Sequence, residues 1–295
     1  MTVKPVVAGT DGSVESLRAV DWAAREAALR GLPLRIVSAA ALPPRMTERQ
    51  REAVSGLDTV SDTLRKERDR ALAAAAERVR AAAPELLIDV DELTGAPAQA
   101  LTEAGSGAAM LVVGARGIGA FTALILGSVS QYVSAHATCP VVVVREETTA
   151  ATRQVGVGIG DPARSAAALA FAFEEASLRK ASLIAVHALN MPSGKTGAAV
   201  WALATPGRPT LEEDAARQLD SVLADWQGRY PDVQVTHDFV QGHPGRALVG
   251  LSARADLVVL GRHAKHGALP GPGAVRHAVL NHAHGPVVTV PSPSS

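Results

Sequence analysis

The sequence has little of several features that mark particular classes of protein. Cys139 is its one cysteine, so no intrachain disulfide can form, and a reducing compartment is expected. Basic and acidic residues number 29 each, and this balance disfavours nucleic acid or a membrane surface as the main partner. No run approaches the ~18 apolar residues of a membrane span, and the first residues have no apolar signal core. These absences predict a cytoplasmic protein that binds neither nucleic acid nor membrane.

What the sequence does contain is a regular alternation of apolar runs and helical spacing. In the first half, short runs predict strands at residues 5–9, 34–38, 86–93, 110–113 and 141–145. Helices are predicted between them, ending at Gly31, running from Thr47 or Leu57 to Ala83, from Pro97 toward Ala104, and from Ser128 to Ala137. This alternation predicts an α/β fold, with a mainly parallel sheet that has helices on both faces.

The second half repeats the order of the first. Matching features are separated by 146 to 150 residues. His136 and His282 are 146 residues apart, and Asp11 and Asp161 are 150 residues apart. A period of this length is a whole domain, too long for the unit of a solenoid. We therefore predict two tandem domains, residues 1–147 and 153–295, each with a five-stranded mainly parallel sheet.

A glycine-spaced loop follows the predicted strand at 110–113. Two residues separate Gly114 from Gly117, and nine more precede Gly127 and Ser128. Ser128 is placed to cap a helix, and the free backbone N–H groups at such a helix start hold phosphate in many α/β proteins. The loop is neither a Walker P-loop, which needs a Lys-Ser/Thr pair, nor a dinucleotide fingerprint, which follows the first strand. We expect the ligand to be an anion.

The spacing G-x2-G-x9-G-[ST] resembles the ATP-binding signature of the universal stress protein family, and the resemblance covers both halves of the chain. It implies two Rossmann-like domains of the adenine nucleotide alpha hydrolase-like kind. It also implies an ATP-binding protein that serves as a nucleotide-dependent regulatory or stress-response module. ATP is the implied cofactor, with Mg²⁺ as an optional companion, while a homodimer and an unidentified regulatory protein partner stay open.

The resemblance also assigns ligand contacts to residues of the first half. The matching positions are Gly9, Thr10, Asp11, Ala39, Gly114, Arg116, Gly117, Gly127, Ser128, Val129 and Ser130. Asp11 would approach the adenosine, where a carboxylate can accept from ribose hydroxyls, although a plain turn or cap residue is the alternative. Ala39 would contact adenine through its backbone. Arg116 would either pair with phosphate or be a solvated loop residue.

The second half departs from the signature. With Gly261 as the first glycine, Ala264 takes the place of the second, and Gly273-Ala274 replaces the Gly-Ser pair. The loop is one residue shorter, and Pro270 and Pro272, which lack an N–H, interrupt it. Asp161 is retained, and compensation would have to come from Arg262, Lys265 or His266. We expect weak nucleotide binding, or none, in this half.

No catalytic or metal site is predicted. Ser128, His136 and Asp11 supply the residue types of a hydrolase triad, but eight helical positions put the first two ~12 Å apart. The histidines at 277, 282 and 284 lack helical metal-ligand spacing and an acidic companion.

Two alternatives to an ATP-binding module stay open. One is a binder of another adenine nucleotide, such as cyclic AMP. The other is an enzyme, at most a slow ATPase, because no catalytic Lys or acidic pair is present in the loop.

Overall fold

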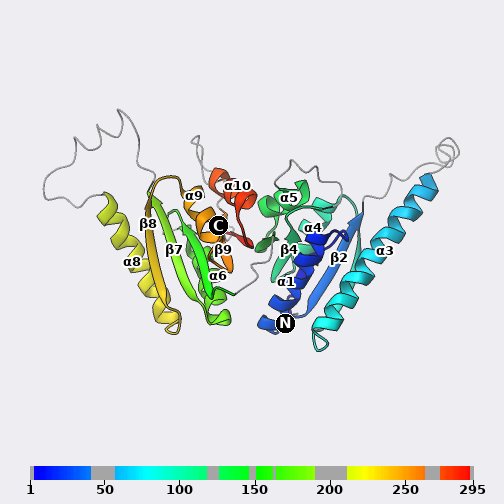
Figure 1. Ribbon diagram of the computed structural model, residues 1–295, viewed down its shortest axis with the longest axis horizontal. Coiled ribbons are helices and arrows are strands. Elements are labelled where there is room, and N and C mark those ends of the chain that lie inside the picture. The colour runs from blue at the N-terminus through cyan, green and yellow to red at the C-terminus, as the bar shows by residue number, and fades with distance from the viewer. Residues whose placement is uncertain are drawn as a thin grey trace. The chain divides into compact units, whose positions relative to one another are not determined.

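A computed structural model describes residues 3–40, 57–117, 126–145, 151–161, 164–189, 211–262 and 273–292 (Figure 1). The chain divides into two compact units, Met1–Glu147 and Thr148–Ser295. Within these described ranges, no helix has the length and apolar character needed to cross a membrane. We describe each unit by itself.

Unit 1 contains a five-stranded parallel sheet in the order β3-β2-β1-β4-β5. Its strands are β1 (Val6–Gly9), β2 (Leu34–Ala40), β3 (Ile88–Thr94), β4 (Met110–Gly114) and β5 (Val141–Val144). Every residue of β1, β4 and β5 is buried. Such apolar strands are typical of a parallel sheet that is covered on both faces.

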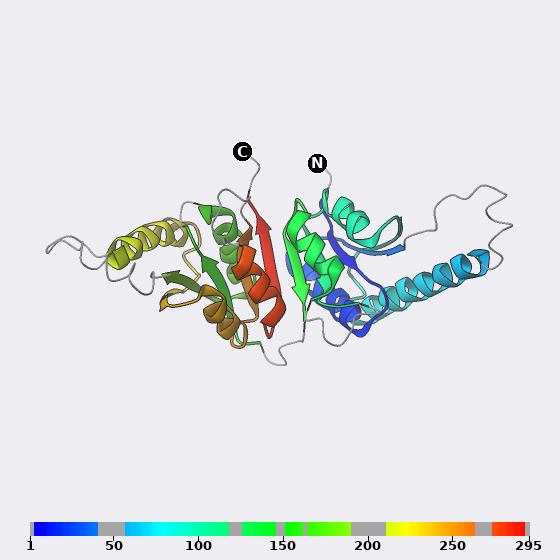
Figure 2. The same cartoon turned by 90° about the horizontal axis from the view of Figure 1, so that it is seen from above.

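Four described helices cover the two faces of this sheet (Figure 2). They are α1 (Val14–Arg30), α3 (Leu57–Ala82), α4 (Pro97–Gly105) and α5 (Ser128–His136). Helices α1 and α3 contact each other, as do α4 and α5. A Cβ at Gly9 would contact Leu101 of α4, whereas a Cβ at Gly114 would contact Glu15 of α1, so the two helices lie on opposite faces.

The strand order places a switch point between β1 and β4. The chain leaves β1 for α1 on one face, and it leaves β4 for α5 on the other. In open α/β sheets, ligands bind in the crevice that opens at the carboxyl ends of the strands at such a point. This part of unit 1 is therefore where a ligand site is expected.

Local capping explains where α1 begins and ends. The Ser13 side chain accepts a hydrogen bond from the Ser16 N–H, which satisfies one of the free donors of the first turn. At the other end, Gly31 adopts the left-handed conformation with φ of 63°, and its N–H donates to the carbonyls of Ala27 and Ala28.

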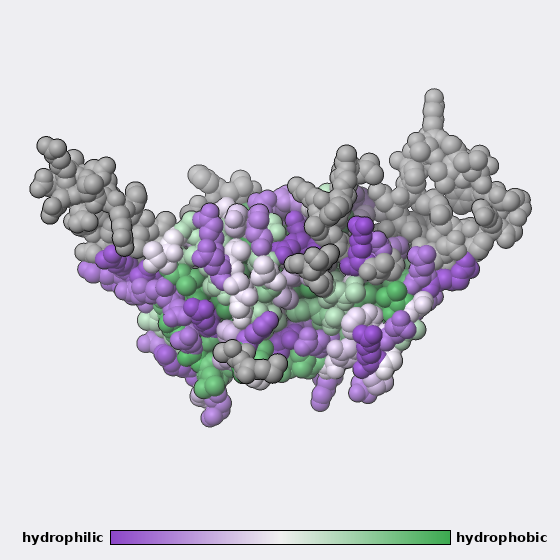
Figure 3. Space-filling model, turned by 180° about the vertical axis from the view of Figure 1, so that it is seen from behind, coloured by the Kyte–Doolittle hydropathy of each residue, from purple (hydrophilic) through white to green (hydrophobic). Residues whose placement is uncertain are grey.

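The long helix α3 is amphipathic, as its sequence predicts. Leu72, Ala75, Ala76 and Val79 are buried, whereas the charged side chains Glu77 and Arg80 are exposed. Most of its described charged side chains are exposed, as predicted, but the Arg68 side chain is 9% exposed and pairs with Glu92. Figure 3 shows hydrophilic residues spread over one face of the molecule with smaller hydrophobic areas among them, as expected for a chain with many exposed charges of both signs.

Unit 2 repeats the parallel sheet, in the order β8-β7-β6-β9-β10. Its strands are β6 (Gln154–Ile159), β7 (Ser182–Leu189), β8 (Val235–Gln241), β9 (Leu257–Arg262) and β10 (Val287–Pro291). Its described helices are α6 (Ala166–Arg179), α8 (Leu211–Arg229), α9 (Pro244–Ser252) and α10 (Gly273–His282). The α/β fold predicted for each half is confirmed.

Several predicted boundaries are wrong by one or two residues. The third strand begins at Ile88 and not at Leu86, because the Leu86 N–H donates to the carbonyl of Ala83 in the turn that follows α3. Helix α4 continues to Gly105, and α5 ends at His136. The described part of α3 begins at Leu57, while the alternative start at Thr47 lies outside the described residues.

Candidate functional site

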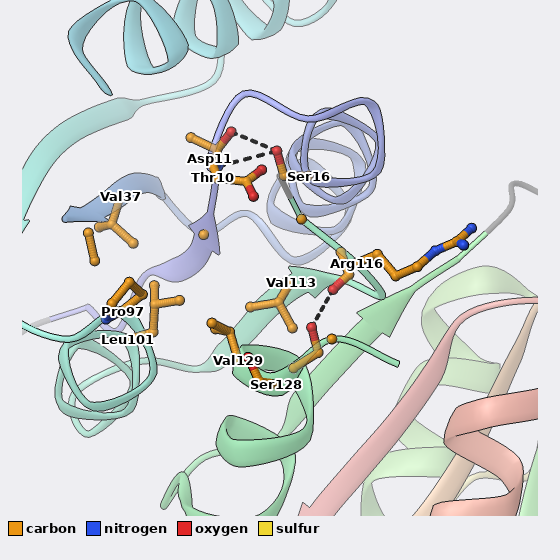
Figure 4. A pocket seen from close by; sticks show the side chains of 16 residues that line it. Thr10, Asp11, Ser16, Val37, Pro97, Leu101, Val113, Arg116, Ser128 and Val129 are labelled. Carbon is orange, nitrogen blue, oxygen red and sulfur yellow. Dashed lines mark hydrogen bonds between the residues drawn. The ribbon is translucent and has the colours of Figure 1, made fainter. Parts of the chain in front are cut away.

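A cavity of about 430 Å³ opens at the carboxyl ends of β1 and β4 in unit 1 (Figure 4). Its size is within the usual range for small-molecule sites, roughly 300–1,000 Å³. It is lined by Gly9, Thr10, Asp11, Ser16, Val37, Ala39, Pro97, Leu101, Val113, Gly114, Arg116, Gly117, Gly127, Ser128, Val129 and Ser130. All eleven residues that the motif resemblance picks out are among them, so the fold brings the whole predicted set together around one cavity.

Five lining residues were not predicted from the sequence: Ser16, Val37, Pro97, Leu101 and Val113. Two of them carried a usable signal. Side chains two residues apart on a strand share a face of the sheet, so a ligand contact at Ala39 predicts that Val37 also lines the cavity. Pro97 begins the helix directly after β3, at the same edge of the sheet.

The turn after β1 is held by a network of short hydrogen bonds. The Ser16 hydroxyl donates to the Ser13 carbonyl at 2.9 Å and accepts from the Asp11 N–H at 3.3 Å. Thr10 Oγ1 lies 3.1 Å from Ser16 Oγ, and it must be the donor there because the single Ser16 hydrogen is already used. The Gly12 N–H in turn donates to Thr10 Oγ1 at 3.2 Å. Ser16 is therefore a support of the turn that presents Asp11.

Asp11 is fixed between this turn and the glycine loop. Its Oδ1 accepts a hydrogen bond from the Ser13 N–H at 3.0 Å. Its Oδ2 occupies the space where a side chain at Gly117 would begin, because a Cβ built on Gly117 would overlap it. The turn role and the ligand role proposed for Asp11 are thus compatible, since one oxygen serves the turn while the residue lines the cavity.

The other two loop glycines permit close approaches of backbone. A Cβ on Gly114 would lie 2.8 Å from the carbonyl carbon and oxygen of Glu15, so α1 can begin beside β4 only because residue 114 has no side chain. The Gly127 N–H donates to the Ala115 carbonyl at 2.7 Å, which closes the loop at its two ends. These glycines shape the cavity by packing.

The start of α5 differs from the prediction. Gly127, not Ser128, is the N-cap residue, and no side chain caps this helix. Ser128 is the first helical residue and is exposed at the cavity, so its hydroxyl is not used for capping. The Ser130 hydroxyl is buried and donates to the Gly114 carbonyl at 2.6 Å. The N–H groups of the first turn stay without side-chain caps, which is the arrangement that binds anions at helix starts.

Arg116 is the sole basic residue among the described residues that line the cavity. Its Nη2 lies 3.7 Å from Glu15 Oε1, and the two side chains are 39% and 30% exposed. In Figure 4 the Arg116 side chain extends away from the other labelled side chains. Its guanidinium group is therefore neither turned into the cavity nor left unpaired in solvent.

The geometry agrees with the exclusion of a Ser-His-Asp triad. Ser128 and His136 are the first and last residues of α5, and His136 Nδ1 is 2.8 Å from the Tyr132 carbonyl. The imidazole also stacks on the Tyr132 ring, with centroids 4.1 Å apart. His136 thus belongs to the far end of the helix and does not reach the cavity.

In unit 2, the strand register corrects the alignment of the two halves. A Cβ at Gly158 would meet Leu248 and Leu260, just as one at Gly9 would meet Leu101 and Val113. Gly158 thus takes the place of Gly9, and Asp161 lies one residue further along its turn than Asp11 does.

Asp161 also has different surroundings from Asp11. Its Oδ2 lies 3.4 Å from Arg164 Nε, and both side chains are more than half exposed. The replacements at Ala264, Lys265, His266, Pro270 and Pro272 lie outside the described residues. Gly261 and Arg262 are the last residues of β9, and Gly273 and Ala274 begin α10.

The comparisons with known proteins agree along the whole chain. Residues 2–145 and 151–291 each match the model of the universal stress protein family. Universal stress protein Rv2005c of Mycobacterium tuberculosis (strain ATCC 25618 / H37Rv) is 35% identical over 300 residues, which cover 96% of this chain and 95% of the relative. A universal stress protein from Archaeoglobus fulgidus DSM 4304 has the same fold, with a TM-score of 0.70, 16% identity and 99% of each chain covered. A universal stress protein solved in complex with cAMP is 32% identical, covers 49% of this chain and 98% of its own, and has a TM-score of 0.38.

Proposed function

Because the chain belongs to the universal stress protein family, with two of the family's domains in tandem, we propose that unit 1 binds an adenine nucleotide in the cavity between β1 and β4. ATP is the ligand that the glycine motif favours. The observation that carries the proposal is that all eleven motif positions line one cavity at the switch point of the sheet. A regulatory or stress-response module in the cytoplasm is the role that fits such a binder.

The two sides of the cavity differ in chemistry. Val37, Ala39, Pro97, Leu101 and Val113 offer an apolar wall that suits a flat base. On the other side, the uncapped N–H groups at the start of α5 and the glycine loop suit a phosphate. Asp11 also lines the cavity, where a carboxylate can accept from ribose hydroxyls. The cavity therefore offers one matching surface for each of the three parts of a nucleotide.

The cavity favours binding over catalysis. Among the lining residues that the structure describes, Asp11 is the sole carboxylate and no lysine is present. Phosphoryl transfer normally uses a lysine and paired acidic residues to position phosphate and Mg²⁺. A Mg²⁺ that accompanies ATP would find one protein carboxylate here, Asp11, and take its other ligands from phosphate and water. We therefore expect hydrolysis that is slow at most.

Unit 2 is proposed to bind nucleotide more weakly, or not at all. Its Asp161 is displaced by one residue and lies beside Arg164. Two prolines and an alanine stand where unit 1 has donors or a close-approach glycine. Each lost charge-assisted hydrogen bond is worth about 1.5–3 kcal/mol, so two such losses weaken binding by orders of magnitude.

Titration calorimetry on the full chain tests these proposals. The panel contains ATP with and without Mg²⁺, cyclic AMP, adenosine and GTP, and turnover is followed on the same sample. We expect about one binding site per chain for the adenine compounds, and hydrolysis of ATP that is slow at most. Absence of binding by every adenine compound would refute the proposed function, and two equal sites would refute the difference between the units.

A further inference from the structure

The one cation among the described residues of the cavity is turned away from it. Arg116 is among the lining residues, yet Figure 4 shows its side chain extending away from the other labelled side chains. Its Nη2 is 3.7 Å from Oε1 of Glu15, an acidic residue in the first turn of α1. A guanidinium group held this way cannot meet a phosphate at the start of α5 without leaving Glu15.

The position of Glu15 is fixed by packing. Its backbone carbonyl lies where a Cβ on Gly114 would come within 2.8 Å, so the first turn of α1 rests directly against the start of the glycine loop. Arg116 is two residues after Gly114. The carboxylate is thus presented beside the loop by the same close approach that requires glycine at 114.

No other side-chain charge in this loop can replace Arg116. Residues 118–125 read IGAFTALI, and none of them is charged. Among the described residues that line the cavity, Asp11 is negative and the rest, apart from Arg116, are uncharged. Among the residues that the structure describes, the groups left to hold phosphate are therefore backbone N–H groups and the helix start, which serve one phosphate well.

We propose that Glu15 is a positioning residue that keeps Arg116 away from the phosphates, so that unit 1 binds adenine nucleotides as a class and discriminates little between one phosphate and three. This rests on the proposed function of the same cavity. To contact a phosphate, Arg116 has to give up its ion pair with Glu15, which costs part of the free energy gained, although exposed ion pairs are individually weak. Neutralising Glu15 removes this cost, so the affinity for ATP rises by a few-fold while that for adenosine does not.

The test is a titration of the full chain with adenosine, AMP, ADP and ATP, in EDTA so that no divalent cation bridges the phosphates. For the wild type we expect dissociation constants within about fivefold of one another along this series. Glu15→Gln should leave adenosine unchanged and tighten ATP by about two- to fivefold, the most that the loss of one exposed ion pair would cost. Glu77→Gln removes an exposed charge from α3 and serves as the matched control, with no change expected for any ligand.

The double variant Glu15→Gln with Arg116→Gln separates the proposed route from a direct effect of the charge. The gain in ATP affinity should disappear when Arg116 is absent. A gain that persists in the Arg116→Gln background would overturn the positioning role, and so would a Glu15→Gln series identical to the wild type while adenosine still binds. If the wild type binds none of the four compounds, the proposed function fails first, and this inference fails with it.

Discussion

Asp11 and Gly117 are in direct apposition, so that the carboxylate Oδ2 of one fills the space in which any side chain of the other would begin. The two residues come from different elements, the turn after β1 and the loop after β4. Their contact joins the two carboxyl ends that frame the cavity. A side chain at residue 117 would therefore have to move the Asp11 carboxylate, which links the second glycine of the motif to the turn after β1.

Gly117→Ala is expected to weaken adenine nucleotide binding by about tenfold, because its Cβ forces the Asp11 carboxylate out of its place in the cavity. Gly107→Ala is the control, since a Cβ at Gly107 would meet nothing within 4 Å. Calorimetry on both variants decides the point. Equal affinity in Gly117→Ala and the wild type would show that the contact between Asp11 and Gly117 plays no part in nucleotide binding.

Ser128 and Ser130 should respond oppositely to the same substitution. Ser130→Ala removes the hydrogen bond to the Gly114 carbonyl, so we expect a loss of about 1–2 kcal/mol in the free energy of unfolding. Ser128→Ala should change stability by less than about 0.5 kcal/mol but cost about 1–3 kcal/mol in nucleotide binding. Urea unfolding and calorimetry on both variants separate the two effects, and a reversed pattern would contradict the assignment of the two hydroxyls.

A buried ion pair occurs at the same place in both units. Arg30 Nε lies 2.5 Å from Glu26 Oε1 in α1, and Arg179 Nη2 lies 3.1 Å from Glu175 Oε2 in α6. Glu26 is almost fully buried, so Arg30→Ala leaves its carboxylate without this partner and should cost about 3 kcal/mol of stability.

The control for that prediction is Arg80→Ala, which removes an exposed arginine from the last turn of α3. Its unfolding free energy should stay within about 0.5 kcal/mol of the wild type. Urea unfolding of both variants is the measurement. Equal small losses would mean that Arg30 contributes no more than a surface arginine.

Helix ends in the two units use different residues for the same backbone conformation. Gly31 ends α1 with φ of 63°, whereas Lys180 ends α6 with φ of 51°, where a side chain is strained. Lys180→Gly should therefore raise the unfolding free energy by about 0.5–1 kcal/mol. Lys180→Ala retains the strain and should change little, and a loss of stability in Lys180→Gly would refute the argument.

Much of the site could be predicted before the structure. The glycine spacing from Gly114 to Ser128 identifies the loop, and the strand pattern identifies β1 and β4, whose carboxyl ends meet at a switch point. These features are local, and parallel sheets bring strand ends together in a regular way. Ser16, Leu101 and Val113 could not be chosen in this manner, because their places depend on how α1, α4 and β4 pack.

The sequence by itself determined the repeat, the strands and helices to within a few residues, and the set of loop glycines, because periodicity and turn residues act over short distances. The tertiary structure alone decided which serine hydroxyl is exposed at the cavity and which supports the loop, and which way Arg116 points (Figure 4). It also decided that Asp161 lies one residue further along its turn than Asp11 does. Each of these depends on contacts between residues from different elements, such as Glu15 with Gly114, and such contacts exist only once the strands and helices have packed.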